Sequence, residues 1–146
     1  MIKRLLDISA VTASLILAAA PATASDDTAG MMRFCKLGAK DAPQAIYACT
    51  TVLENGDPSL KQEALLSRGL AYTSRRWYAQ ALADFDALVK LNPKMSGAWN
   101  SRGWVYLKTG RPREALADFD RALSLEKGEK YMINREAALK AIAEAQ

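Results

Sequence analysis

The hexapeptide Ala-Leu-Ala-Asp-Phe-Asp occurs twice in this chain, at residues 81–86 and again at residues 115–120. The two copies lie 34 residues apart, and the same register relates Arg68-Gly69 to Arg102-Gly103. A fixed internal period of this size indicates an array of stacked structural units. The sequence therefore predicts a repeat fold, and the position of each residue within its repeat becomes the guide to its role.

Helix start and stop signals divide each repeat into two helices. Residues 41–44 and 59–62 each begin with Asp or Ser and end with Gln, the pattern of a capping box at a helix N-terminus. Gly and Pro residues mark the helix ends and starts between these segments. No segment has the signature of a strand, so we expect an all-α fold. The expected helices cover approximately residues 28–37, 41–55, 59–74, 78–91, 94–108, 112–125 and 129–145.

The N-terminal residues 1–24 have the pattern of a cleavable export signal. Lys and Arg at positions 3 and 4 precede an apolar run over residues 8–20, and small residues at 22–24 fit a signal peptidase site. The apolar run is shorter than the approximately 20 residues of a membrane span, although an uncleaved anchor is the alternative. We therefore expect an exported protein, in the periplasm of a Gram-negative bacterium, with no membrane insertion after cleavage.

Charge and composition exclude several functional classes. Of the 20 basic and 16 acidic residues, 18 and 15 remain after loss of the signal, and no basic stripe suggests binding to nucleic acid. The chain has no His and no pairing of a nucleophile with a base, so we expect neither an enzyme nor a metal site, and no cofactor. Two Cys alone supply only half of a tetrahedral metal site.

The repeated positions resemble the tetratricopeptide repeat, a helix–turn–helix unit whose signature combines an aromatic, a Gly, a Tyr, an Ala, a second aromatic and a Pro. One unit, residues 62–95, matches at Leu65, Gly69, Tyr72, Ala81, Phe85 and Pro93. The next, residues 96–129, matches at Trp99, Gly103, Tyr106, Ala115 and Phe119. The resemblance implies a short right-handed α-solenoid over residues 25–146. Residues 28–58 would then form a degenerate first repeat and residues 130–146 a capping helix.

In the degenerate repeat, Cys35 falls on the first helix and Cys49 on the second, where Cys49 takes the place of Phe85. Two thiols in an oxidising compartment are expected to pair, so we predict a Cys35–Cys49 disulfide that replaces an aromatic contact. The alternative is a pair of buried free thiols.

The two regular repeats carry an Arg where the family usually has Leu before the Gly, and an Asp before the second aromatic. This resembles a variant common in exported bacterial tetratricopeptide proteins. A guanidinium between helices needs a carboxylate partner. We predict structural Arg68–Asp84 and Arg102–Asp118 contacts, or an Arg102–Asp84 contact between units, and expect the second Asp of each hexapeptide to be a solvated surface charge.

In this family the first helix of each pair lines the concave surface. By position, the resemblance places on that surface Glu63, Leu66, Leu70, Thr73, Gly97, Asn100, Trp104, Lys108, Asn134 and Arg135. The residues expected to bind the partner are Leu66, Leu70, Asn100, Trp104, Lys108 and Arg135. Trp104 is the expected anchor, unless it covers the last helix, and Asn100, Lys108 and Arg135 are candidates to hold a terminal carboxylate of a peptide. We therefore expect a non-catalytic module that binds a peptide or helix of an envelope protein. The alternatives are a homo-oligomer formed by stacking of the repeat ends and a non-catalytic subunit of an enzyme.

Overall fold

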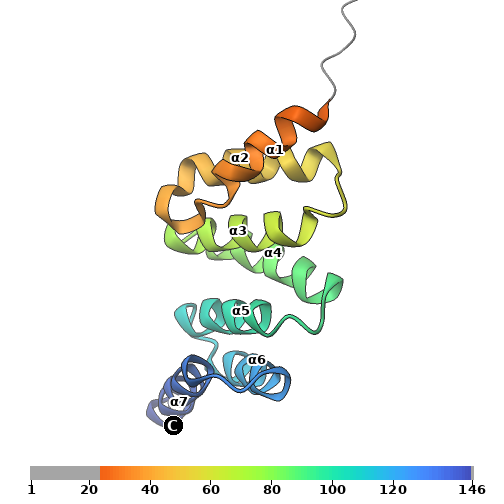
Figure 1. Ribbon diagram of the computed structural model, residues 1–146. Helices are drawn as coiled ribbons and strands as arrows, with labels where there is room; N and C mark the ends of the chain where they lie inside the picture. The colour runs from red at the N-terminus through yellow and green to blue at the C-terminus, as the bar shows by residue number, and fades with distance from the viewer. Residues whose placement is uncertain (1–23, 146) are drawn as a thin grey trace, which may run out of the picture.

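A computed structural model describes residues 24–145 of the protein, and every regular element in that range is helical. The elements follow one another as a row of helices from one end of the molecule to the other (Figure 1). They are α1 (Ala24–Cys35), the 3₁₀ helix η1 (Gly38–Asp41), α2 (Ala42–Asn55), α3 (Lys61–Ser74), α4 (Tyr78–Leu91), α5 (Ser96–Lys108), α6 (Pro112–Leu125) and α7 (Glu129–Glu144).

Each helix packs mainly against its neighbours along the chain, so α1–α2, α3–α4 and α5–α6 form successive pairs and α7 covers α6. Figure 1 shows these pairs stacked in order, with α7 at the end opposite α1. This arrangement of described residues is the predicted α-solenoid of helix pairs. The buried clusters join elements that are close in sequence and continue from one helix pair into the next, as expected for a quasi-one-dimensional fold.

The helix boundaries test the capping signals directly. At α2, the Asp41 carboxylate accepts a hydrogen bond from the Gln44 backbone N–H at 3.4 Å, as predicted. The capping box predicted at Ser59 is wrong. The Ser59 N–H and hydroxyl both donate to Asp57 Oδ1, at 2.9 and 2.7 Å, and α3 begins two residues later at Lys61. The Asp57 carboxylate forms a local turn with Ser59 and accepts the hydrogen bond from its hydroxyl. The Ser59 side chain therefore does not cap α3.

Close contact between the helices of each regular pair depends on a glycine. A Cβ atom built at Gly69 would lie 2.6 Å from Phe85 Cε1, and one at Gly103 would lie 2.8 Å from Phe119 Cε1. Both Phe rings are fully buried. The repeated Gly and Phe are therefore two halves of one contact, in which the missing side chain leaves room for the ring.

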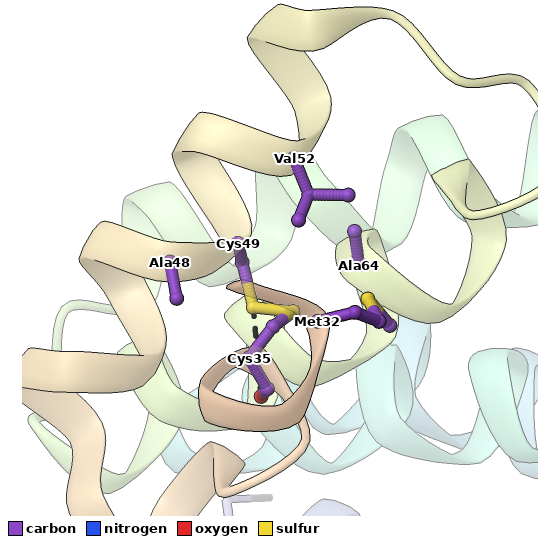
Figure 2. Close-up of a cluster of buried hydrophobic side chains, with 6 residues drawn as sticks. All are labelled: Met32, Cys35, Ala48, Cys49, Val52 and Ala64. Carbon is purple, nitrogen blue, oxygen red and sulfur yellow. Dashed lines mark hydrogen bonds between the residues drawn. A yellow bond between two sulfur atoms is a disulfide. The ribbon is translucent and has the colours of Figure 1, made fainter. Parts of the chain in front are cut away.

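In the first pair the same contact is made by a disulfide. Cys35 lies 34 residues before Gly69, and Cys49 lies 36 residues before Phe85. The structure contains the predicted Cys35–Cys49 disulfide, with a Cα–Cα distance of 4.7 Å. Figure 2 shows it surrounded by a cluster of buried side chains from α1, α2 and α3. A covalent bond thus joins α1 to α2 where a Gly and a Phe join the later pairs.

The last helix, α7, covers the apolar surface of the second regular repeat. Ala138 packs in one buried cluster with Ala115 and Phe119. At the other end of α7, the Tyr131 hydroxyl donates to Glu126 Oε2 at 3.2 Å and lies 3.1 Å from Ser96 Oγ. Both contacts give α7 the capping role that the sequence predicted.

The export signal predicted for residues 1–24 lies outside the described residues, except for Ala24, the first residue of α1. Among residues 24–145, no helix is long and apolar enough to span a bilayer.

Candidate functional site

The predicted ion pairs lie in the seam between the two helices of each regular repeat. In the first, Arg68 Nε and Nη2 donate to the two carboxylate oxygens of Asp84, at 2.8 and 2.7 Å. In the second, Arg102 donates to Asp118 in the same way, at 2.8 Å for both bonds. Asp84 and Asp118 are buried. These bidentate pairs fix the angle between two helices, because a planar guanidinium fits a carboxylate in one orientation.

The third guanidinium nitrogen of each Arg reaches back to the preceding helix pair. Arg102 Nη1 donates to Asp86 Oδ1 at 2.7 Å, so the prediction that the second Asp of the hexapeptide is only a solvated charge is wrong. The alternative contact between units, Arg102–Asp84, is wrong as well, because Asp84 pairs with Arg68. Arg68 Nη1 makes the corresponding bond to Thr50 Oγ1 at 3.0 Å. Each Arg therefore joins two helices of its own repeat to the repeat before it.

The same pattern continues to the capping helix. Arg135 Nε donates to Asp120 Oδ1 at 2.6 Å, so the second hexapeptide also uses its final Asp to hold the next helix. This pairing changes the expected role of Arg135. Its side chain bonds to a residue of α6, and it is absent from the side chains that line the hollows described below. Arg135 belongs to the polar contacts between units.

Charged and aromatic groups surround the Arg102 side chain in the seam between α5 and α6. Hydrogen bonds from Arg102 to Asp118 raise the pKa of the guanidinium above its already high value, against the opposing effect of desolvation. Burial raises the pKa of Asp118, and the hydrogen bonds from Arg102 act in the opposite direction. The guanidinium also lies 4.8 Å from the ring centroid of Trp99. A cation in such an environment is held in place by both charge and aromatic contact.

A hollow of about 280 Å³ lies among α3, α5 and α7. Its floor includes Phe85, and its walls include Leu70 on α3 and Trp104 on α5, whose side chains are 39% and 36% exposed. Asn100 and Asn134 line the side toward α7. The structure thus brings together three of the predicted site residues, Leu70, Asn100 and Trp104, around one depression.

The two asparagines form an amide pair across that depression. Asn134 Nδ2 donates to Asn100 Oδ1 at 2.8 Å. Within residues 24–145, this bond leaves Nδ2 of Asn100 and Oδ1 of Asn134 as one donor and one acceptor at the edge of the hollow. Asn134 lies 34 residues after Asn100, so the repeat register places one Asn beside the other.

A second hollow, of about 530 Å³, adjoins the first and shares Thr73 and Trp104 with it. Its lining is polar and cationic: Thr73, Ser74, Arg76, Tyr78, Trp104 and Lys108. The Lys108 ammonium lies 4.4 Å from the ring centroid of Trp104. Trp104 therefore separates the apolar hollow from the cationic one and lines both.

The remaining predicted residue, Leu66, is half-buried. It packs against the core clusters around Leu65 and Phe85 and is absent from the lining of either hollow. Thr73 was placed on this surface by its position in the repeat, and it lines both hollows, but the contribution of Arg76 was missed. The repeat register indicates Thr73, but Arg76 lies in a turn, where register gives no direction for the side chain.

No group of three or more Cys, Asp or Glu side chains that would hold a metal ion occurs among the described residues, and the sequence has no His. The acidic side chains of the hexapeptides are engaged in the helix contacts given above. The features of this surface are those of a recognition site: an exposed aromatic, a shallow apolar depression and adjoining polar groups.

Stacked helix pairs, with a hollow lined mainly by residues of α3, α5 and α7, define this protein as an α-helical repeat protein. Residues 66–130 match the family model described as tetratricopeptide repeat. The helical array of this chain is a tetratricopeptide-repeat domain.

Relatives and solved structures agree with this assignment. The human Superkiller complex protein 3 is 32% identical over 103 residues, which are 70% of this chain but 7% of that protein. Among solved structures, the Arabidopsis OM64 TPR domain has a TM-score of 0.72 and 20% identity, and the match covers 80% of this chain and 98% of that one. The first TPR of Spaghetti (RPAP3), solved bound to the HSP90 peptide SRMEEVD, has a TM-score of 0.70 and 22% identity. Its match covers 82% of this chain and 93% of that one.

Proposed function

We propose that this protein is a non-catalytic interaction module that binds an extended segment of a partner protein across α3, α5 and α7. The observation that carries the proposal is the position of Trp104. It lies at the junction of two hollows and remains 36% exposed, although the chain has buried aromatic side chains elsewhere. A partly exposed aromatic beside a preformed depression is a typical anchor for a partner.

The chemistry of the depression suits a peptide in extended conformation. An apolar side chain of the peptide would fill the hollow between Leu70 and Trp104. The backbone beside it would meet the amide pair of Asn100 and Asn134, whose remaining donor and acceptor match one N–H and one C=O. The likeness to a domain solved with a bound HSP90 peptide supports this mode of binding.

We further propose that the partner is an envelope protein and that the module works in the periplasm. The signal-like pattern of residues 1–24 supports export. The disulfide between the buried Cys35 and Cys49 supports an oxidising compartment, because such bonds are rare in the cytosol.

Photocrosslinking in living cells tests the binding surface. Benzoylphenylalanine placed at Leu70 in the apolar hollow is expected to crosslink a specific partner, which mass spectrometry identifies. The same photoreactive residue at Tyr47, 67% exposed on α2, is the matched control and is expected to give no such product. Crosslinking of the same partner from position 47 but not from position 70 would contradict the proposed surface.

Self-association is a second candidate, because the outward face of α7 exposes Met132, Ile133 and Leu139 at 51%, 57% and 40%. Such a face at the end of a repeat array is suited to stacking on another molecule. Light scattering across a range of protein concentrations tests this. A dimer that becomes a monomer in the Ile133→Glu variant supports self-association, and a monomer at every concentration rejects it.

A further inference from the structure

Two basic side chains of the cationic hollow beside Trp104 take no part in the ion pairs given for residues 24–145. Arg76 and Lys108 both line it and are both exposed. Among residues 24–145, neither side chain is paired with a carboxylate, and none of the residues that line this hollow is acidic. Two positive charges thus face one depression without a counter-ion from the described chain.

The backbone at Arg76 gives a second and independent observation. Its φ of 59° lies in the left-handed region, and it is the one non-glycine residue with positive φ among those described. The corresponding turn of the next repeat has Gly110 at φ 73°. A side chain in this conformation costs on the order of 1 kcal/mol, and such strain is found at functional positions more than elsewhere. An Arg therefore occupies a turn position whose backbone conformation would suit a glycine better.

The ends of α3 and α5 also meet at this hollow, and a helix C-terminus carries partial negative charge. The last carbonyl groups are capped, however. Arg76 N–H donates to Thr73 O at 3.0 Å, and Gly110 N–H donates to Leu107 O at 3.2 Å. The two full charges of Arg76 and Lys108 therefore set the sign of the local potential, which favours an anion.

We propose that this hollow binds an acidic side chain of the partner segment, one residue away from the apolar side chain that fills the neighbouring hollow. The spacing follows from the shared lining. Thr73 and Trp104 belong to both hollows, so the two lie side by side across the path of the peptide. Successive side chains of an extended peptide point in opposite directions. An apolar residue followed by Asp or Glu therefore places one side chain in each hollow.

This inference rests on the proposed function and names the sequence that the groove selects. Peptides labelled with fluorescein provide the test, by fluorescence anisotropy at low salt with the purified domain. The first probe is a nonapeptide of Gly and Ser with a central Leu-Asp pair and an amidated C-terminus. The matched probes are Leu-Asn, Ala-Asp, and Leu-Asn with a free terminal carboxylate.

We expect the Leu-Asp probe to bind about threefold to tenfold more tightly than Leu-Asn, as for one carboxylate near two partly exposed cations. Lys108→Gln and Arg76→Gly should each reduce this preference, and the double variant should abolish it. Lys90→Gln is the control. Lys90 is exposed in the last turn of α4, as Lys108 is in the last turn of α5, but it lines neither hollow. This control should leave the preference unchanged.

The outcomes separate the two proposals. If Leu-Asp and Leu-Asn bind equally, and both bind more tightly than Ala-Asp, the groove is retained and the acidic subsite is rejected. If only the probe with a free terminal carboxylate gains affinity, the hollow holds a chain end, and the proposal of an acidic side chain is overturned. Binding of none of the four probes at millimolar concentration contradicts both proposals.

Discussion

The first helix pair and the two regular repeats join their helices at the same point by different chemistry. In the regular repeats a Gly leaves room for a buried Phe, and in the first pair Cys35 and Cys49 form a disulfide instead. The regular repeats add an Arg–Asp pair in the seam, whereas no ion pair joins α1 to α2 among the side chains that the structure describes. The difference indicates that the repeat geometry tolerates several solutions, provided that the contact between the helices stays short.

The polar contacts between units also differ between the first junction and the second. At the first junction, Arg68 meets the neutral hydroxyl of Thr50, whereas at the second Arg102 meets the carboxylate of Asp86. The ion pair that crosses the first junction is the exposed Lys36–Glu63 pair, at 3.0 Å, and not a bridge from the seam Arg. We infer that the disulfide is needed to stabilise a pair that packs, within residues 24–145, against one neighbouring pair.

Removal of the disulfide is expected to have the largest effect. The Cys35→Ala, Cys49→Ala double variant should destabilise the first pair by about 3 kcal/mol, by the entropy of closing a loop of about 15 residues. Hydrogen exchange measured by mass spectrometry should show fast exchange in α1 and α2. The amides of α5 to α7 should exchange at the wild-type rate, because local units open independently. Equal loss of protection in α1 and α7 would contradict the expectation that the disulfide stabilises the first pair alone.

Loss of a seam carboxylate should have the next largest effect, and it should differ between the repeats. Asp84→Ala leaves Arg68 with Thr50 as its remaining hydrogen-bond partner, and we expect a cost of about 2.5 kcal/mol, below the range for fully buried pairs because Arg68 is partly exposed. Asp118→Ala leaves Arg102 paired with Asp86, so the cost should be about 1 kcal/mol smaller. Urea unfolding of both variants measures this difference, and a larger cost for Asp118→Ala would contradict it.

The double variant Arg68→Ala, Asp84→Ala refines this measurement. If the two side chains act as a unit, the double variant should cost about as much as either single variant. Simple addition of the two single costs would show that they act independently.

Two substitutions in α5 test the contact between Gly103 and Phe119. Gly103→Ala introduces a Cβ at 2.8 Å from Phe119 Cε1 and should destabilise by about 2 kcal/mol through overpacking. Gly97→Ala, in the same helix, meets nothing within 4 Å and should be neutral or stabilising by up to about 1 kcal/mol. Thermal unfolding of the two variants provides the measurement. Stabilisation of both variants would show that helix propensity, and not the contact, decides the outcome.

The smallest effect is expected at the turns. Arg76→Gly should change stability by less than about 0.5 kcal/mol, because relief of strain and the greater freedom of the unfolded chain offset one another. Gly110→Ala, at the corresponding turn, should cost about 1 kcal/mol, since Ala disfavours a φ of 73°. A large loss of stability in Arg76→Gly, measured by the same unfolding experiments, would mean that the Arg76 side chain serves the fold.

The 34-residue repeat, together with the helix start and stop signals, was sufficient to predict the helix pairs, the Arg68–Asp84 and Arg102–Asp118 contacts and the family. These are contacts within a unit, where register alone decides which residues meet. The bridges from Arg102 to Asp86 and from Arg135 to Asp120 were missed because they depend on how one unit is rotated on the next. The 36-residue offset of the first unit contains the missing signal. Counting 36 residues back from Asp86 reaches Thr50, which makes the corresponding bond.

The groove was predicted only in part for a similar reason. Leu70, Asn100 and Trp104 are at positions where the repeat register gives the direction of the side chain. Arg76 lies in a turn, where the Gly at the corresponding position 110 indicates a left-handed backbone but gives no direction for a long side chain. Leu66 and Arg135 were assigned to the groove by position, but the first packs in the core and the second is held by Asp120. In both cases a contact with another helix, and not the position within the repeat, determines where the side chain lies.

The most direct test of the central claim compares two tryptophans. The partner segment identified by crosslinking is titrated against Trp104→Ala and Trp77→Ala. Both side chains are partly exposed, at 36% and 44%, but only Trp104 lines the hollows. We predict that Trp104→Ala weakens binding by at least about tenfold, as expected for an aromatic anchor, and that Trp77→Ala leaves the dissociation constant within about twofold of wild type. Equal affinities of the two variants for the segment would contradict the account.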